Sequence, residues 1–188
     1  EAVNLSDSEF FQVSAKAIEY CEARRAFYIM DVPQKETPRN NPAAVKSWLN
    51  SNSTLRHKNT AVYFPRPLVP DQLNDYALRT IAASGTIAGV FARIDEGRGV
   101  WKAPAGTEAE LRGVQQLEYN LTNNENGGLN SLAVNCLRNF NVYGTVAWGA
   151  RTLEGAGSTS TEWKYISVRR LALFIEESVD RGTNWTVF

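Results

Sequence analysis

Apolar positions near the start of the chain recur every three or four residues, the spacing of one face of a helix. Ser6 and Glu9 stand three residues apart at its beginning, as in a capping box, and predict a helix that ends near Arg25. The stretch 26–32 is short and mostly apolar and closes at Pro33, which predicts a buried strand. The chain is therefore expected to open with a helix followed by a strand.

A second helix and a second strand come next. Asn41 and Pro42 occupy the positions of an N-cap and a first-turn proline, and the helix they begin is expected to end in the Asn/Ser-rich segment 50–59. Residues 60–64 are largely apolar and predict a strand that the following prolines stop. Strand, helix and strand in succession predict a βαβ unit, in which the strands are parallel and the crossover is right-handed.

Two further helices are predicted. One begins at Ser84, and Gly85 and Gly89 lie four residues apart on it, a spacing that lets another backbone approach closely. The last helix is expected to be capped by Ser167 and ended by Gly182. Its apolar stripe comprises Val168, Leu171, Ile175 and Val179.

The second half of the chain also contains strands. Two apolar runs, 132–137 and 142–153, flank residues 138–141, which predicts a hairpin with a tight connection. A Gly/Ser loop over 155–160 leads to a further short strand at 163–166. The fold class is therefore α/β (mixed α+β), with a mixed parallel and antiparallel sheet flanked by helices and an opening βαβ unit. We expect residues 1–188 to form one domain.

Composition changes this picture little. Hydrophobic residues make up 43% of the 188 positions and charged residues 21%, as in ordinary globular proteins. Twenty Lys and Arg balance twenty Asp and Glu, which argues against a protein that binds duplex DNA and removes the charge repulsion that keeps copies apart. No apolar run is long enough to span a bilayer, and no signal peptide is recognised. The first residue is Glu1 rather than Met, and Phe188 closes an apolar run, so we expect an excerpt of a longer protein.

The residues that most catalytic sites require are missing. His57 is the sole histidine and cannot anchor a zinc site of ordinary composition without a second His or a Cys pair. The chain contains neither a G-x-S-x-G motif nor a phosphate-binding P-loop. Gly97 and Gly99 follow a predicted helix rather than a strand, which is the wrong order for a dinucleotide site. We predict no catalytic, cofactor-binding or metal-ligating residues and no cofactor.

Four other features of the sequence are interpreted as structural rather than catalytic. Asp31 ends the first predicted strand, where α/β enzymes often keep a carboxylate, but its place before a proline favours a turn-forming role. Arg169 and Arg170 are interpreted as a solvated or interface-pairing face. Cys21 and Cys136 are predicted to be buried and unbridged, because two thiols do not make a disulfide framework. Trp101, Trp148, Trp163 and Trp185 are interpreted as core or interface anchors.

Several stretches, taken in order, resemble the sheath proteins of contractile tails: phage tails, R-type pyocins and extracellular contractile injection systems. The stretches are AIEYCEARR at 17–25, DVP at 31–33, SGTIAGVFARID at 84–95, RGVWKAPA at 98–105, LN at 129–130, VNCLR at 134–138, WGARTL at 148–153, EWKYISVRRL at 162–171, FIEES at 174–178 and WTVF at 185–188. Ala82 and Ala83 depart from the family pattern, which has Pro-Pro there. The pattern also continues beyond the closing Phe, so the chain resembles the inner core of a sheath subunit without its N-terminal region and C-terminal arm.

The resemblance implies a mechanical role. Sheath subunits form stacked hexameric rings around an inner tube and contract to drive the tube through a target membrane. The implied partners are other sheath subunits, the inner tube protein, and baseplate and tail-terminator proteins, with no nucleic acid and no small-molecule substrate. The implied location is the contractile particle or virion, assembled in the bacterial cytoplasm. Because terminal arms link neighbouring subunits in this family, we expect the 188-residue chain alone to fold but not to polymerise into sheath.

An α/β enzyme or nucleotide-binding domain with an unrecognised site is the alternative. The opening βαβ unit favours it, but no completed site accompanies that unit, and fold alone does not decide function.

Overall fold

A four-stranded sheet forms the centre of the molecule in the computed structural model, which describes residues 5–33, 41–156 and 161–187. Its strands, in spatial order, are β1 (Tyr28–Met30), β2 (Thr60–Phe64), β6 (Val134–Phe140) and β7 (Gly144–Ala147). The first three are parallel, with Ile29 opposite Ala61 and Tyr63 opposite Asn135, and β7 runs antiparallel to β6. The predicted mixed sheet is confirmed.

The opening βαβ unit is confirmed as well. Helix α2 (Pro42–Ser51) connects β1 to β2, and these two strands are parallel. The Asn41 side chain accepts a hydrogen bond from the Ala43 backbone N–H at 2.9 Å, so Asn41 is the N-cap that the sequence predicts. Residues 34–40, part of the predicted loop, lie outside the described residues.

The described residues form four more α-helices: α1 (Asp7–Ala23), α3 (Ala83–Arg98), α4 (Asn123–Asn130) and α5 (Ile166–Thr183). The predicted capping box of α1 is present, because the Ser6 N–H donates to the Glu9 carboxylate at 2.9 Å and the Glu9 N–H donates to Ser6 Oγ at 3.4 Å. Short 3₁₀ turns cover Ser53–Leu55, Leu153–Gly155, Glu162–Lys164 and Asn184–Val187.

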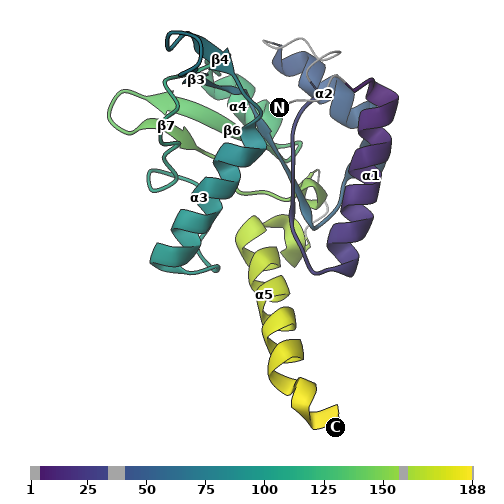
Figure 1. The fold of residues 1–188 in the computed structure, drawn as a ribbon. Coiled ribbons are helices and arrows are strands. Elements are labelled where there is room, and N and C mark those ends of the chain that lie inside the picture. Colours follow the sequence, from purple (N-terminus) through teal and green to yellow (C-terminus); the bar gives the residue numbers. More distant parts are fainter. Residues whose placement is uncertain (1–4, 34–40, 157–160, 188) are drawn as a thin grey trace.

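The sheet separates two apolar cores, because alternate residues of β2 point to opposite faces. Val62 and Phe64 pack in the core beneath α1 and α2. Ala61 and Tyr63 pack in the other core, against α3. Figure 1 shows α1 and α2 on one side of the sheet and α3 on the other. All five residues of β2 are buried, as expected for a strand covered on both faces.

A small second sheet was not predicted. It has the order β4-β3-β5 and is antiparallel, with β3 at Pro67–Pro70, β4 at Leu78–Thr80 and β5 at Gln116–Leu117. The prolines after residue 64 end β2 as predicted, but Pro67 and Pro70 also stand at the two ends of β3, a strand that the sequence did not predict. A proline at a strand end leaves the interior ladder intact, so the strand forms between them.

The antiparallel hairpin is confirmed but its turn is displaced. Residues 138–140, which we placed in the connection, belong to β6, and the chain reverses between Phe140 and Gly144 instead. Arg138 pairs with Val146 across the hairpin and Asn139 with Thr145. The pairing continues because the Asn139 side chain donates to Thr145 Oγ1 at 2.9 Å, a polar cross-strand contact.

The C-terminal segment differs from the prediction in two respects. In place of a strand at 163–166, the chain forms the 3₁₀ turn Glu162–Lys164 and a single bridge between Tyr165 and Arg151. Helix α5 begins at Ile166, with Tyr165 as a cap residue that makes no side-chain bond, so Ser167 is not the cap. The helix runs through Gly182 to Thr183. Of the predicted Gly/Ser loop, residues 157–160 are not among the described residues.

Candidate assembly surface on helix α5

Asp31 is a structural carboxylate. Its two oxygens accept hydrogen bonds from the Ser84 backbone N–H at 2.9 Å and from the Ser84 hydroxyl at 2.5 Å. Ser84 lies in the first turn of α3, whose N-cap, Ala82, has no side-chain acceptor of its own. Asp31 therefore caps α3 from a distant part of the chain, rather than forming the turn that the sequence predicted.

His57 also has a local structural role. Its Nδ1 accepts a hydrogen bond from the Asn59 backbone N–H at 3.1 Å, and its Nε2 lies 3.5 Å from a Glu22 carboxylate oxygen. The neighbouring side chains of His57 and Lys58 lower the pKa of the Glu22 carboxyl. This contact connects the loop before β2 to the end of α1, and no nucleophile is placed beside the imidazole by any contact among the described residues.

Both cysteines are free thiols, as predicted. Cys136 is buried in the core beneath α1 and α2, and burial raises its pKa to about 12. Cys21 is only half-buried, so the prediction of full burial is wrong for this residue. A thiol with a raised pKa is a poor nucleophile, and neither environment is that of a catalytic cysteine.

No group of three or more His, Cys, Asp or Glu side chains that could hold a metal ion occurs within ranges 5–33, 41–156 and 161–187. Nor does any helix in those ranges have the length and apolarity needed to cross a membrane. A polar groove of about 560 Å³ lies between β5 and β6. Its lining is mostly carboxamide side chains, together with Arg138: Gln115, Gln116, Asn120, Asn139 and Asn141.

The glycines singled out in the sequence have two different environments. The space beside Gly85 and Gly89 is empty to 4 Å, so no backbone of the described residues uses the close approach that these glycines permit. Gly99 ends α3 with a φ of +100°, and the ring of Trp101 lies against it. Only glycine suits position 99, because other residues rarely adopt this φ and a Cβ there would collide with the Trp101 ring. The segment Gly97–Gly99 therefore ends a helix and is not a phosphate site.

The base of α5 is anchored by Arg169, which is 6% exposed. Its Nε donates to Asn59 Oδ1 at 2.6 Å, and its guanidinium carbon lies 4.9 Å from the centre of the Trp163 ring. The prediction of a solvated arginine is therefore wrong for Arg169. Asn59 is 110 positions away in sequence, and the local charge pattern gave no sign of this contact.

Arg170 connects α5 to α3. Its two terminal nitrogens donate to the two carboxylate oxygens of Asp95, and its guanidinium lies 4.6 Å from the centre of the Phe91 ring. Of the two interpretations, a solvated face or a face that pairs at an interface, Arg170 fits the second. The interface lies inside the chain, between α5 and α3. Tyr63 lies in the same core; burial raises its pKa and the charge of Arg170 opposes that shift.

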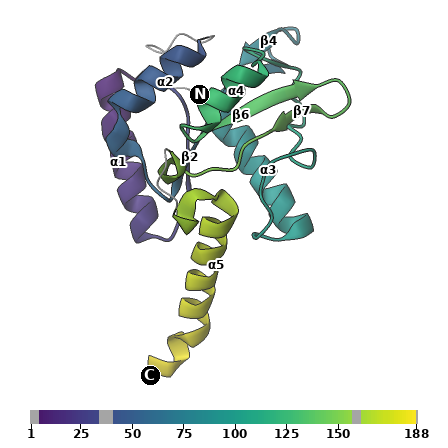
Figure 2. The ribbon, with the colours of Figure 1, turned by 180° about the vertical axis from the view of Figure 1, so that it is seen from behind.

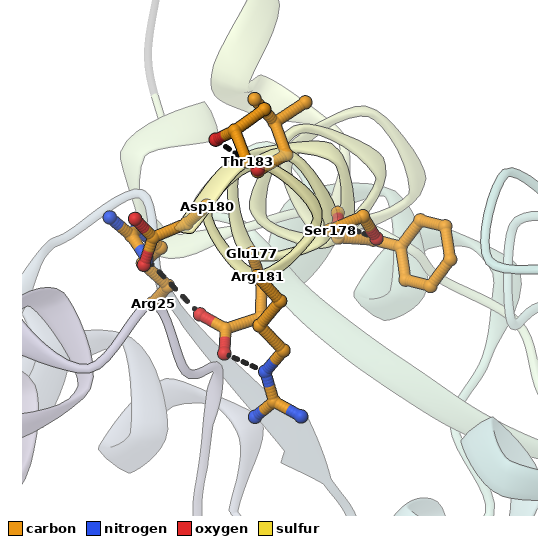
Figure 3. A network of polar contacts seen from close by, with 8 residues as sticks. Arg25, Glu177, Ser178, Asp180, Arg181 and Thr183 are labelled. Carbon is orange, nitrogen blue, oxygen red and sulfur yellow. Dashed lines mark hydrogen bonds and ion pairs between the residues drawn. The ribbon is translucent and has the colours of Figure 1, made fainter. Parts of the chain in front are cut away.

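A third arginine, Arg25, holds the outer part of α5. It follows the end of α1 with a φ of +52°, and its Nη1 donates to Asp180 at 2.7 Å and to Glu177 at 3.2 Å. Glu177 also accepts from Arg181 at 2.6 Å. Figure 3 shows Arg25 reaching from the side toward these acidic residues of α5. We did not identify this contact from the sequence, where a helix-ending arginine looks like an ordinary C-terminal cation.

The three arginines leave one side of α5 without partners among the described residues. The helix extends away from the body of the molecule in both views (Figures 1 and 2). Its body-facing side carries Arg169, Glu177, Asp180 and the buried Leu173. The predicted apolar stripe lies on the other side, where Phe174, Ile175 and Val179 are more than half exposed. An amphipathic helix normally buries its apolar side, so α5 presents a surface suited to another protein segment.

Most tryptophans are exposed too. Trp101, Trp148 and Trp185 are 66%, 42% and 75% exposed, and Trp163 is half-buried beneath Arg169. The interpretation of these residues as core anchors is wrong; the buried tryptophan is Trp48, which lies in α2 and packs against Phe10 of α1. Exposed aromatic residues are enriched in protein–protein interfaces, which fits the alternative interpretation as interface anchors.

Comparisons with known proteins find similar chains in contractile tails and injection systems. No family model matches the chain. The tail sheath protein of Vibrio phage KVP40 (isolate Vibrio parahaemolyticus/Japan/Matsuzaki/1991) is 27% identical over 119 residues, which cover 63% of this chain and 17% of that protein.

Solved structures match over nearly the whole chain. A chain of the PVC sheath complex, an extracellular contractile injection system in the contracted state, is 30% identical with a TM-score of 0.76, over 94% of this chain and 46% of its own. A chain of the contracted helical sheath of the anti-feeding prophage is 28% identical with a TM-score of 0.72, over 97% and 45%. A chain of the six-fold symmetrised baseplate of the same prophage gives 28% and 0.73, over 97% and 44%. The chain thus spans less than half the length of these relatives.

Proposed function

Because this chain belongs to the contractile sheath protein family, we propose that it is the core part of a sheath subunit in a phage tail or an extracellular contractile injection system. The family is structural and not enzymatic. The subunit contacts other sheath subunits and the baseplate as part of a contractile particle. At the finer level, we propose that it polymerises as stacked hexameric rings around an inner tube and contracts to drive the tube through a membrane.

The observation that carries this proposal is that the chain is similar to sheath-system chains in both sequence and three-dimensional structure. Sequence identity of 27–30% accompanies TM-scores of 0.69–0.76 in chains from sheath and baseplate structures, over at least 94% of this chain. A fold shared without sequence identity leaves function open, because one fold hosts many functions. Here both agree, over at least 94% of this chain.

The surface chemistry supports the same proposal. The side chains that had catalytic alternatives are engaged in the fold: Asp31 caps α3, His57 connects a loop to α1, and Cys136 is buried. What the chain exposes instead is apolar and aromatic surface on α5 and on the β6–β7 hairpin. We further propose that residues 1–188 form one domain and carry no catalytic, metal or cofactor site.

Gold labelling of native particles tests the proposal. Antibodies raised against the 188-residue chain are applied to contractile particles from the source organism and imaged by electron microscopy. The expected result is gold at regular intervals along the tail wall of extended and contracted particles. If the gold labels only soluble protein and none lies on the tail wall, the result would refute a sheath function and favour an α/β enzyme.

A further inference from the structure

We propose that His57, the sole histidine of the chain, makes the attachment of α5 to the body sensitive to pH between about pH 8 and pH 5. The effect passes from the imidazole through Asn59 to Arg169 at the base of the helix. This response belongs to the fold of the chain and would be present whether or not the chain serves in a sheath.

His57 holds the turn that leads into β2. The Thr60 N–H donates to the His57 carbonyl at 3.2 Å, which closes a turn over residues 57–60. Inside that turn the Asn59 N–H donates to His57 Nδ1 at 3.1 Å. A side chain that accepts from the backbone N–H two residues later makes the bond of an Asx turn, here with an imidazole in place of a carboxylate or carboxamide.

Two other positions of the chain make the same kind of bond with ordinary side chains. Asn41 accepts from the Ala43 N–H at 2.9 Å, and the Asp71 carboxylate accepts from the Leu73 N–H at 3.1 Å. A carboxamide takes up no proton, and a carboxylate does so only in acid. The imidazole is therefore the one acceptor of these three that changes charge near neutral pH.

Protonation of His57 removes this acceptor. A neutral imidazole has a proton on one nitrogen and a lone pair on the other, whereas the charged form carries a proton on both. Nδ1 must hold the lone pair to accept from Asn59, so a proton added there would face the Asn59 N–H, donor against donor. Asn59 is 0% exposed, and leaving a buried N–H without an acceptor is costly. Asn59 must therefore shift or lose this bond when the imidazole is charged.

The charged groups around His57 do not relieve this conflict. Glu22, near the end of α1, has a carboxylate oxygen 3.5 Å from Nε2, and the Nζ of Lys58 lies 3.5 Å from the same oxygen. Glu22 attracts the charged imidazole through Nε2, which keeps Nδ1 directed at Asn59. The guanidinium of Arg56 donates to a backbone carbonyl of another segment, at 3.1 Å. The conflict therefore falls on the Asn59 side of the ring.

Asn59 connects the turn to α5. Its Oδ1 accepts from Arg169 Nε at 2.6 Å, and its carbonyl accepts from the Tyr28 N–H of β1 at 2.7 Å. Its Nδ2 is buried and has no hydrogen-bond partner among the described residues, so the side chain is held through Oδ1. A shift of the Asn59 backbone therefore acts directly on the bond that anchors Arg169.

The response of His57 can be separated from that of other groups. Other ordinary side chains change charge outside the range of pH 5 to 8. Burial raises the pKa of both thiols, and that of Cys136 to about 12. Hydrogen bonds from Arg181 and Arg25 lower the pKa of Glu177 from 4.5, so the outer contact of α5 titrates in stronger acid.

A titration of the isotope-labelled chain from about pH 8 to pH 5, followed by nuclear magnetic resonance, tests the proposal. The measured signals are the ring nitrogens of His57, the Asn59 amide and the Arg169 Nε–H. At the upper pH, Nδ1 is expected to be unprotonated, and the Asn59 and Arg169 signals should then shift with the midpoint of the ring nitrogens. A proton on Nδ1 at the upper pH, or an Arg169 signal that does not follow this midpoint, would overturn the proposal.

Two variants assign the response to Nδ1. His57→Asn keeps an acceptor for the N–H two residues later, as Asn41 does, but takes up no proton, so its Asn59 and Arg169 signals should stay in place across the range. Glu22→Gln removes the charge beside Nε2 and leaves the Nδ1 bond, so the joint shift should persist. A shift that remains in His57→Asn, or one that disappears in Glu22→Gln, would contradict the proposal.

Amide hydrogen exchange measures the consequence for α5. The exchange rate of residues 166–173 in the wild type is divided by that in His57→Asn at the same pH, which cancels the intrinsic pH dependence of exchange. This ratio should rise about tenfold between pH 8 and pH 5, because one buried hydrogen bond is lost. An unchanged ratio would show that protonation stays local to the turn and would overturn the proposal. The wild-type titration decides the case even if His57→Asn fails to fold.

Discussion

Arg170 and Asp95 join α5 to α3 through a two-bond ion pair, and the same guanidinium stacks on Phe91. Both side chains are largely buried, at 15% and 25% exposure. Arginine suits this site because its planar group can bond a carboxylate along one edge and stack on a ring with its face. The pair fixes the direction in which α5 leaves the body.

Arg170→Ala should therefore destabilise the fold. The substitution removes two charge-assisted hydrogen bonds and leaves Asp95 partly buried without its cation, at a cost of about 2–3 kcal/mol. Urea unfolding followed by tryptophan fluorescence measures the loss. Arg112→Ala is the control, because Arg112 is 72% exposed and its ion pair with Glu110 is 3.9 Å long; it should change stability by less than about 0.5 kcal/mol. Equal losses for both variants would show that the Arg170 pair contributes nothing special.

Asp31→Ala should weaken α3 from its N-terminus. It removes the acceptor for the Ser84 N–H and hydroxyl, and losing a helix cap costs about 1 kcal/mol. Asp31→Asn keeps an oxygen acceptor and should cost less. Amide hydrogen exchange of residues 84–87 locates the effect, which should be faster in Asp31→Ala than in Asp31→Asn. Unchanged exchange in this turn would mean that Asp31 does not cap the helix.

Gly99 and Gly97 provide a matched pair of substitutions at the end of α3. A Cβ on Gly99 would lie 2.4 Å from the Trp101 ring, on backbone with a φ of +100°, so Gly99→Ala should cost about 1–3 kcal/mol. The space beside Gly97 is open, and Gly97→Ala should be neutral or stabilise by about 0.5 kcal/mol. Thermal unfolding of the two variants gives the comparison. Similar melting temperatures for the two would contradict the packing of Trp101 on Gly99.

The contact between Arg25 and α5 should depend on pH. Hydrogen bonds from Arg181 and Arg25 lower the pKa of Glu177 below its ordinary 4.5. Because the folded-state pKa is the lower one, the stabilisation is fully present above pH 4.5 and is lost as the pH falls through the folded-state pKa. Amide protection in residues 177–183 should therefore decrease as the pH falls below 4.5. Glu177→Gln should show the weaker protection at every pH, and a wild type without this pH dependence would rule out the ion pair.

Where the sequence predicted the fold correctly, the signal was local. Ser6 with Glu9 and Asn41 with Pro42 mark two helix starts, and both helices begin there. Helix α4 was missed although Thr122 and Glu125 have the same capping-box spacing, because Gly127 and Gly128 are poor helix formers. Packing of Leu129 in the core outweighs that propensity, and packing cannot be seen in a short window.

The candidate surface was only partly predictable, for a related reason. The helical period of the apolar residues identified the stripe, which comprises Val168, Leu171, Ile175 and Val179. The resemblance of the whole chain to sheath proteins, and not the stripe, indicated the proposed function. Periodicity cannot say which side of a helix faces the body. That is decided by Arg169 with Asn59 and by Arg25 with Asp180, contacts between residues more than a hundred positions apart.

Helical reconstruction of the intact particle by cryo-electron microscopy tests the central claim most directly. The fold described for residues 5–33, 41–156 and 161–187 is expected to repeat around a six-fold wall. A wall in which this fold is absent would contradict the sheath function.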